Sequence, residues 1–336
     1  MQSILLMAIG SACAASFYVP LKKIQIWSWE SYWIVQGVAA WIIAPWLFAY
    51  FTVPDLVPLL SNLPLTAVWR TVFFGMLWGV GGLTFGLSMR YLGVALGQSI
   101  ALGFCAAFGT LIPAIIEKGN LFSDASGILI VVGVSLCIAG IAIIGYAGAL
   151  KNKNLSEEER KASVKEFALK KGLTIAVFAG VMSACFAFGL QAGEPIKELA
   201  ASKGTNPLYL TNPVLIFILL GGFLTNLVYC VFLNIKNKTA KDYVTGGGGV
   251  IRKNVFFCSL AGFLWFLQFH FFGMGQSKLP AELSVFGWSM LMALNILFSN
   301  VWGIFLHEWK AVGRKTTTVL VVGLVVLILS VFVIKL

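Results

Sequence analysis

The sequence is poor in charged residues. Only 11% of its 336 residues are Asp, Glu, Lys or Arg, whereas an ordinary soluble domain carries about 25%. Apolar residues make up 59% of the chain, and the mean hydropathy is +0.90. The apolar runs are too long and too continuous for the alternating strands of a membrane barrel. This composition excludes a soluble domain and predicts an all-α polytopic protein embedded in a lipid bilayer.

Residues that carry out catalysis or bind metals are also scarce. The chain has two histidines and thirteen acidic residues, and the acidic residues fall in loops or at the ends of apolar runs. No glycine-rich loop ends in Gly-Lys-Ser or Gly-Lys-Thr, which argues against ATP-driven transport by this chain. The six cysteines lie inside apolar runs without a C-x-x-C pair, as packing residues do. We therefore expect that the protein is not an enzyme and that it holds neither a metal nor another cofactor.

Long apolar segments dominate what is present. A membrane-spanning helix needs about 20 mostly apolar residues, and ten segments meet that condition. The predicted spans are Ile4–Val19, Ser31–Thr52, Val68–Met89, Val94–Ile116, Ser126–Ala149, Leu173–Ala192, Pro207–Leu233, Val255–Gln276, Leu283–Leu306 and Thr316–Val333.

The basic residues are distributed unevenly between these spans. Of the 24 lysines and arginines, 18 fall in the loops after the first, third, fifth, seventh and ninth spans. Because cytoplasmic loops are enriched in basic residues, these loops are expected in the cytoplasm and both termini outside. The same bias accounts for the net charge of +11 without a nucleic-acid partner.

A short internal repeat divides the chain into two halves. Five residues of the third span recur 187 positions later, in the eighth span. Gly75, Leu77, Trp78, Phe85 and Gly86 correspond to Gly262, Leu264, Trp265, Phe272 and Gly273. Five spans per half is an odd number, so the halves would be inverted, with residues 1–150 and 172–336 as the repeats and 151–171 as a cytoplasmic linker. Inverted repeats are typical of transporters whose substrate site lies near the bilayer midplane.

The eighth predicted span carries the best candidates for a substrate site. Polar side chains at membrane depth are costly and usually face a cavity or a partner, and Gln268 lies there on the same helical face as Trp265. Trp78 holds the equivalent position in the first repeat, so Trp78 and Trp265 could face each other across the centre. Indole faces stack on sugar rings and amides bind hydroxyls, although packing against lipid or protein is an equal reading.

The hinge between the first two spans supplies further candidates. Tyr18 and Lys22 share one helical face before it, and Trp33 follows it, so we expect all three to line the cytoplasmic side of the cavity. Glu30 is the first candidate for carrying a proton, unless Lys22 or Lys23 pairs with it. His270 is the second candidate.

Glycines one helical turn apart are concentrated in the third and fourth spans. Gly75 and Gly79 form one such pair, Gly82 and Gly86 form another, and Gly93 and Gly97 form a third. Small residues at this spacing let helix backbones approach closely. We expect this packing within one chain rather than between chains, so a monomer is predicted and a dimer stays open.

The hinge sequence resembles the opening of a known family. FYVPLKK followed by WSWE-x-x-W is similar to the L-rhamnose–proton symporter family, within the drug/metabolite transporter superfamily. Further matching motifs are Trp78-Gly79, Met89-Arg90-Tyr91-Leu92-Gly93, Pro207-Leu208-Tyr209, Leu267-Gln268-Phe269, Pro280-Ala281, Glu308-Trp309 and Gly313-Arg314. The resemblance implies a ten-helix drug/metabolite transporter-like fold and import of L-rhamnose, with L-lyxose open, in symport with protons by alternating access. The chain departs from the family pattern at Gln98, Asn212 and His270.

Other functions stay open on sequence grounds. An exporter or exchanger of another small metabolite in the same superfamily would be favoured by a cluster of basic residues at cavity depth, where Lys22 is the one candidate. A membrane-embedded enzyme acting on lipid-linked sugars would need a buried acidic motif. A channel would allow flux without accumulation.

Overall fold

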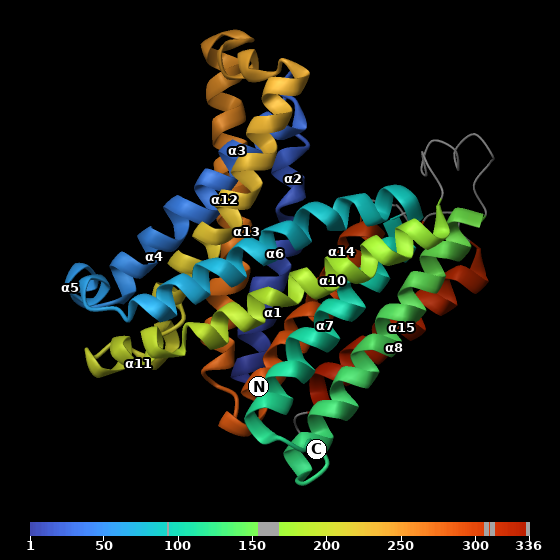
Figure 1. Ribbon diagram of the computed structural model, residues 1–336. Coiled ribbons are helices and arrows are strands. Elements are labelled where there is room, and N and C mark those ends of the chain that lie inside the picture. The colour runs from blue at the N-terminus through green and yellow to red at the C-terminus, as the bar shows by residue number, and fades with distance from the viewer. Residues whose placement is uncertain (93, 154–167, 306–308, 310–312, 334–336) are drawn as a thin grey trace. The chain divides into compact units, whose positions relative to one another are not determined.

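The computed structural model describes residues 1–92, 94–153, 168–305, 309 and 313–333, and within them the chain consists of helices and short connections (Figure 1). The α-helices are α1 (Gln2–Ser16), α2 (Tyr18–Leu21), α3 (Trp29–Gly37), α4 (Ala44–Thr52), α5 (Leu56–Ser61), α6 (Leu65–Leu92), α7 (Val94–Lys118), α8 (Ala125–Lys153), α10 (Leu169–Ala192), α11 (Glu194–Ser202), α12 (Asn212–Asn237), α13 (Gly247–Gln276), α14 (Gly287–Phe305) and α15 (Arg314–Phe332). A π-helical segment, η1 (Val38–Ile43), joins α3 to α4. Short 3₁₀ turns are η2 (Pro207–Tyr209), η3 (Ala240–Val244) and η4 (Ala281–Phe286).

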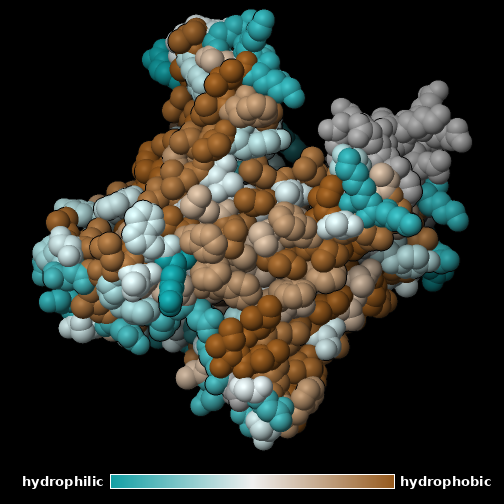
Figure 2. Space-filling model, in the orientation of Figure 1, coloured by the Kyte–Doolittle hydropathy of each residue, from teal (hydrophilic) through white to brown (hydrophobic). Residues whose placement is uncertain are grey.

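The described residues contain ten helical segments that are long and apolar enough to cross a membrane, as predicted. The largest difference from the predicted boundaries is in the sixth span, which continues through α11 to Ser202. Figure 2 shows apolar side chains along the flanks of the helices and hydrophilic side chains gathered near helix ends. Large apolar side chains such as Phe51 and Val228 are 75% and 71% exposed, which suits lipid and not water. The prediction of an all-α polytopic membrane protein is confirmed.

The chain forms two compact units that interleave along the sequence. The first unit contains residues 80–188 and 279–336 together with Met1, and the second contains 2–79 and 189–278. Helices α6 and α10 each contribute to both units. These units are defined by contacts between residues, whereas the predicted halves are defined by a repeat in the sequence. The units therefore do not test the inverted halves 1–150 and 172–336, which stay a prediction. Most of the linker between them, residues 154–167, lies outside the described residues.

In the first unit, small residues and buried polar groups hold the helices together. A Cβ atom added at Gly133 would collide with the ring of Phe286, and one added at Gly140 would meet Leu327. Trp288 donates its indole N–H to the Cys105 carbonyl at 3.2 Å. These contacts join α7, α8, η4, α14 and α15 with little free space between backbones, as helix packing in lipid requires.

In the second unit, α6 and α12 cross at glycines. A Cβ added at Gly75 would run into the Ile218 carbonyl, and one added at Gly221 would run into the Val72 carbonyl. At Gly79 the added atom would meet Thr225 and the Gly222 backbone. The predicted close packing within the chain is therefore confirmed for Gly75 and Gly79. Gly82 and Gly86 have nothing within 4 Å of an added Cβ, so the prediction is wrong for that pair in this structure. Gly93 of the third pair lies outside the described residues.

A local irregularity shapes the second span. The N–H of Ala44 donates to the carbonyl of Ala39, five residues earlier, which is the hydrogen bond of a π-helix. Pro45 follows directly and has no N–H to offer the carbonyl of Trp41 four residues before it. The wider turn changes the direction in which the Trp41 side chain leaves the helix.

We expect Gly75→Ala to destabilise the protein more than Gly86→Ala. The first substitution places a methyl group against the Ile218 backbone, and overpacking of this kind costs about 1–3 kcal/mol. The second lies on the same helix in open space and serves as the matched control. Thermal melting of the purified proteins in detergent checks this, and equal melting temperatures would contradict the close crossing of α6 and α12.

Candidate functional site

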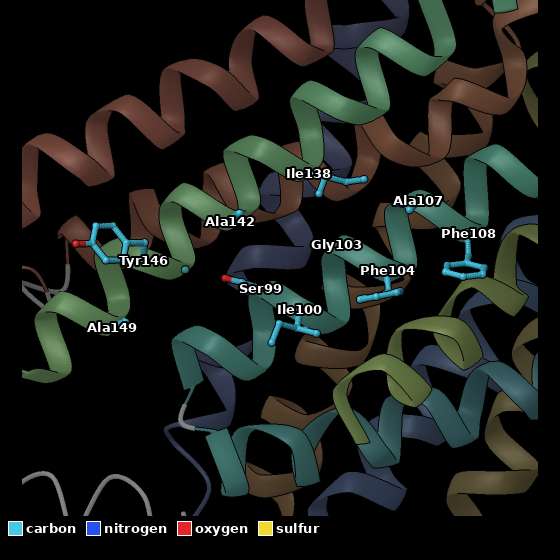
Figure 3. A pocket seen from close by; sticks show the side chains of 11 residues that line it. Ser99, Ile100, Gly103, Phe104, Ala107, Phe108, Ile138, Ala142, Tyr146 and Ala149 are labelled. Carbon is cyan, nitrogen blue, oxygen red and sulfur yellow. The ribbon is translucent and has the colours of Figure 1, made fainter. Parts of the chain in front are cut away.

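The first unit contains a cavity of about 430 Å³ between α7 and α8 (Figure 3). Small residues such as Gly103 and Ala142 create the space, and aromatic or aliphatic side chains fill most of its wall. Ser99 and Tyr146 bring the hydroxyl groups of the lining, which has no charged or amide side chain. A polyhydroxylated ligand would lose its hydrogen bonds to water there without replacement. The cavity therefore suits apolar matter better than a sugar.

The second unit contains a cluster of aromatic side chains around Trp41, which we call the tryptophan cluster. Its members are Trp33, Trp41, Trp78, Phe223, Trp265 and Phe269. The ring centroids of Trp78 and Trp265 are 5.6 Å apart with an interplanar angle of 32°. The structure thus brings together the two tryptophans that the repeat pairs. Both residues are half-buried.

Trp41 lies at the centre of this cluster, and sequence reasoning missed it. Its ring centroid is 6.1 Å from Trp33, 6.4 Å from Trp78 and 5.5 Å from Trp265, each in an edge-on arrangement. The side chain is only 4% exposed. The available signal was Pro45, which frees the Trp41 carbonyl and accompanies the π-helical turn. Such turns are frequent at functional sites.

Two amide side chains border the tryptophan cluster. Gln268 is 6% exposed and donates from Nε2 to the Trp265 carbonyl at 3.1 Å. Asn226 accepts a hydrogen bond from the indole N–H of Trp33 at 3.1 Å and donates to the Gly222 carbonyl at 2.9 Å. Asn226 therefore fixes the Trp33 ring of α3 against α12. Gln268 lies one helical turn from Trp265, on the face predicted from the sequence. Its role in binding hydroxyls stays a prediction.

The structure does not bring Tyr18 and Lys22 into the tryptophan cluster. Tyr18 is 58% exposed, and Lys22 at the end of α2 is exposed as well. Phe17 and Leu21, which directly precede Tyr18 and Lys22 in the same segment, pack against Trp33 and Trp265 instead. The predicted role of Tyr18 and Lys22 in lining the cytoplasmic side of a cavity stays a prediction.

Glu30, at the start of α3, is 5% exposed and held by two neutral donors. Asn237 donates to its Oε1 atom at 3.0 Å, and Thr239 donates to the same oxygen at 2.8 Å. Among the described residues Glu30 makes no ion pair, so the pairing with Lys22 or Lys23 considered from the sequence is not formed here. The carboxyl is thus ordered by the end of α12, about 200 residues further along the chain.

A second carboxyl, Asp242 in η3, lies beside the same hinge. It accepts hydrogen bonds from the Ser28 N–H at 2.7 Å and the Ser31 hydroxyl at 2.9 Å. Burial raises the pKa of the Asp242 carboxyl, but these hydrogen bonds and the nearby Lys241 outweigh burial and leave the pKa below its ordinary value. Asp242 therefore stays charged near neutral pH and fastens the hinge to η3.

His270 is 7% exposed and belongs to a chain of hydrogen bonds. Its Nδ1 lies 3.0 Å from the amide oxygen of Asn212, which in turn donates to the Thr52 hydroxyl at 2.8 Å. Thr52 donates to the Phe48 carbonyl at 2.6 Å. Because an amide oxygen can only accept, His270 donates from Nδ1 and, when neutral, leaves Nε2 as a base. The structure brings into contact Asn212 and His270, two of the three positions at which we expect the sequence to depart from the family pattern.

The imidazole of His270 is enclosed by aromatic rings. Tyr209 stacks on it with centroids 5.9 Å apart at 8°, and Phe48 meets it edge-on at 4.7 Å. No group of three or more His, Cys, Asp or Glu side chains that could hold a metal occurs within the described residues. The arrangement offers a hydrogen-bonded, titratable side chain in an apolar setting.

Comparison with known proteins covers the whole chain. A family model described as L-rhamnose-proton symport protein (RhaT) matches residues 1–336. The L-rhamnose-proton symporter of Cronobacter sakazakii is 36% identical over 326 residues, which cover 96% of this chain and 93% of that protein. Those of Mannheimia succiniciproducens and Yersinia pestis are 35% identical over the same shares. These are transporters and not enzymes, and the chain belongs to the L-rhamnose-proton symport protein family.

Proposed function

We propose that this protein imports L-rhamnose together with protons across the bacterial inner membrane by alternating access. The observation that carries the proposal is the family match over residues 1–336, because it leaves no span of the chain unaccounted for. L-Lyxose is a further candidate substrate. The basic residues in the loops after the first, third, fifth, seventh and ninth spans favour a cytoplasmic location for these loops and an external location for both termini. The glycine contacts inside one chain favour a monomer.

The tryptophan cluster is the proposed sugar site. Trp78 and Trp265 would flank the sugar, whose C–H face is apolar, and Gln268 would bind its hydroxyls. Trp33 would border the site, with Tyr18 and Lys22 toward the cytoplasm. What supports this assignment is that half-buried indoles and a buried amide meet in one place, whereas the cavity of the first unit offers almost no polar partner.

Glu30 is the proposed proton carrier, with His270 as the second candidate. Glu30 is a buried carboxyl without an ion pair among the described residues, and its donors Asn237 and Thr239 are neutral. It lies only three residues before Trp33 on α3, so a change in its charge is close to the sugar site. A buried ionisable group in a membrane span is by default a functional candidate.

The first test is uptake of labelled L-rhamnose by protein reconstituted into liposomes. With an inward proton gradient we expect accumulation above equilibrium, and a protonophore should abolish the accumulation. Uptake that only reaches equilibrium would point to a uniporter or channel. The absence of L-rhamnose flux, with flux of another metabolite, would overturn the proposed substrate.

Conservative changes in the two central tryptophans should weaken sugar binding. Trp78→Phe and Trp265→Phe each remove part of the stacking surface, and we expect KM for L-rhamnose to rise about tenfold, equivalent to about 1.4 kcal/mol. Trp69→Phe is the matched control, since Trp69 lies on α6 with Trp78 but is 65% exposed. A similar KM in all three variants would argue against stacking on Trp78 and Trp265.

Glu30→Gln should separate proton coupling from sugar movement. The amide keeps the shape of the carboxyl but cannot take up a proton, so gradient-driven accumulation should be lost. Exchange of labelled for unlabelled L-rhamnose, which needs no net proton movement, should persist. His270→Phe serves as the comparison. Full accumulation by Glu30→Gln together with loss in His270→Phe would transfer the role to His270.

A further inference from the structure

Gln36 is a buried amide whose two polar atoms have no hydrogen-bond partner. The residue is 0% exposed, and both Nε2 and Oε1 are unpaired. It lies on α3, where its backbone carbonyl packs against Gly262 of α13. Hydrocarbon offers no water to such a group, so leaving it unpaired inside a membrane protein is costly.

Trp41 repeats this feature about one helical turn further along the span. Its indole N–H is also buried without a partner, and its ring is 4% exposed. The Trp41 ring lies where a side chain at Gly37, the residue after Gln36, would be. Three unpaired polar atoms therefore lie on one stretch of the second span, and the indole that carries one of them is beside Trp33, Trp78 and Trp265.

Two other buried helix amides of the second unit are satisfied locally, and two are satisfied by distant groups. Asn226 donates to the Gly222 carbonyl and Asn234 donates to the Cys230 carbonyl, each four residues earlier. Asn212 donates to the Thr52 hydroxyl and Asn254 donates to the Gln25 carbonyl. Gln36 uses neither solution. A buried polar group without a hydrogen-bond partner, in a unit whose other buried amides are paired, marks a candidate functional position.

We propose that Gln36 and Trp41 are specificity-determining residues that bind the hydroxyls of a monosaccharide within the tryptophan cluster. This inference rests on the proposed function and deepens it. The amide of Gln36 accepts from one hydroxyl and donates to a neighbouring one, and the indole N–H of Trp41 donates to a third sugar oxygen. The apolar face of the sugar lies against the neighbouring indoles.

This arrangement selects substrates by hydrogen bonding. A site that pairs buried polar groups with substrate hydroxyls rejects an analogue lacking one of them, because the protein group is then left unpaired. Both residues are enclosed in the structure described, so the surrounding rings move apart when the sugar enters. A 6-deoxy sugar, with several hydroxyls and one apolar methyl group, matches such a mixed surface.

The experiment compares Gln36→Leu and Trp41→Phe with the wild-type protein in liposomes. Each variant keeps most of the side-chain volume and removes the polar atoms. We expect KM for L-rhamnose to rise at least tenfold in each. Against the set of monodeoxy derivatives of L-rhamnose, KM should differ between wild type and Gln36→Leu for most members, and the difference should shrink for the two derivatives that each lack one of the hydroxyls bound by Gln36.

Thermal melting distinguishes a binding role from a structural one. Without sugar, Gln36→Leu should melt at or above the wild-type temperature, since an unpaired buried amide is removed. Added L-rhamnose should raise the wild-type melting temperature more than that of the variant. Thr205→Val is the control, because it also removes a buried, unpaired hydroxyl but lies in the connection before η2; its KM should equal that of the wild type.

Two results would overturn the inference while the proposed function stands. One is an unchanged KM in Gln36→Leu, and the other is a lowered melting temperature with an unchanged response to the deoxy derivatives. Failure of the wild-type protein itself to transport L-rhamnose would instead overturn the proposed function, and with it the sugar named here.

Discussion

The close crossing of α6 and α12 is the contact on which the tryptophan cluster depends. Helices in lipid gain nothing from hiding apolar side chains, so their association relies on dense packing of backbones at small residues. Gly75, Gly221 and Gly222 provide that density, and the Trp78 ring rests where a side chain at position 222 would be. The crossing therefore sets the position of Trp78 against Trp41 and Trp265. Without it, the aromatic rings would have no common centre.

Some buried polar groups of the second unit have hydrogen-bond partners and others have none. At the Glu30 end of α3 and around His270, the titratable groups have specific partners from distant parts of the chain, such as Asn237 for Glu30 and Asn212 for His270. In the middle of the second span, Gln36 and Trp41 have none. Satisfied groups stabilise one arrangement of helices, whereas unsatisfied groups lower the cost of an arrangement in which something else pairs with them. The paired groups therefore stabilise the fold, whereas the unpaired groups are suited to binding.

Several features could be predicted from the sequence because they depend on local patterns. The ten spans follow from apolar length, and the meeting of Trp78 with Trp265 follows from the repeat. The partners of Glu30 could not be predicted, because Asn237 and Thr239 are more than 200 residues away and only the packing of α3 on α12 brings them close. Trp41 was missed because a π-helical turn alters side-chain direction without changing the apolar pattern. The inward packing of Phe17 and Leu21, next to Tyr18 and Lys22, could not be predicted either, because helical spacing groups residues on one face without saying which face is buried.

The tryptophan cluster has a consequence for how the protein interacts with light. Five of the eleven indoles of the chain meet with neighbouring centroids 5.3–6.4 Å apart. They are Trp33, Trp41, Trp78 and Trp265, with Trp29 stacked on Trp33 as the outer member. At such separations excitation passes between rings far faster than it is emitted, so the cluster behaves as one chromophore. Its emission and its circular dichroism then report the arrangement of the whole group. Movement of any one ring is visible without a label, at the place where the sugar is proposed to bind.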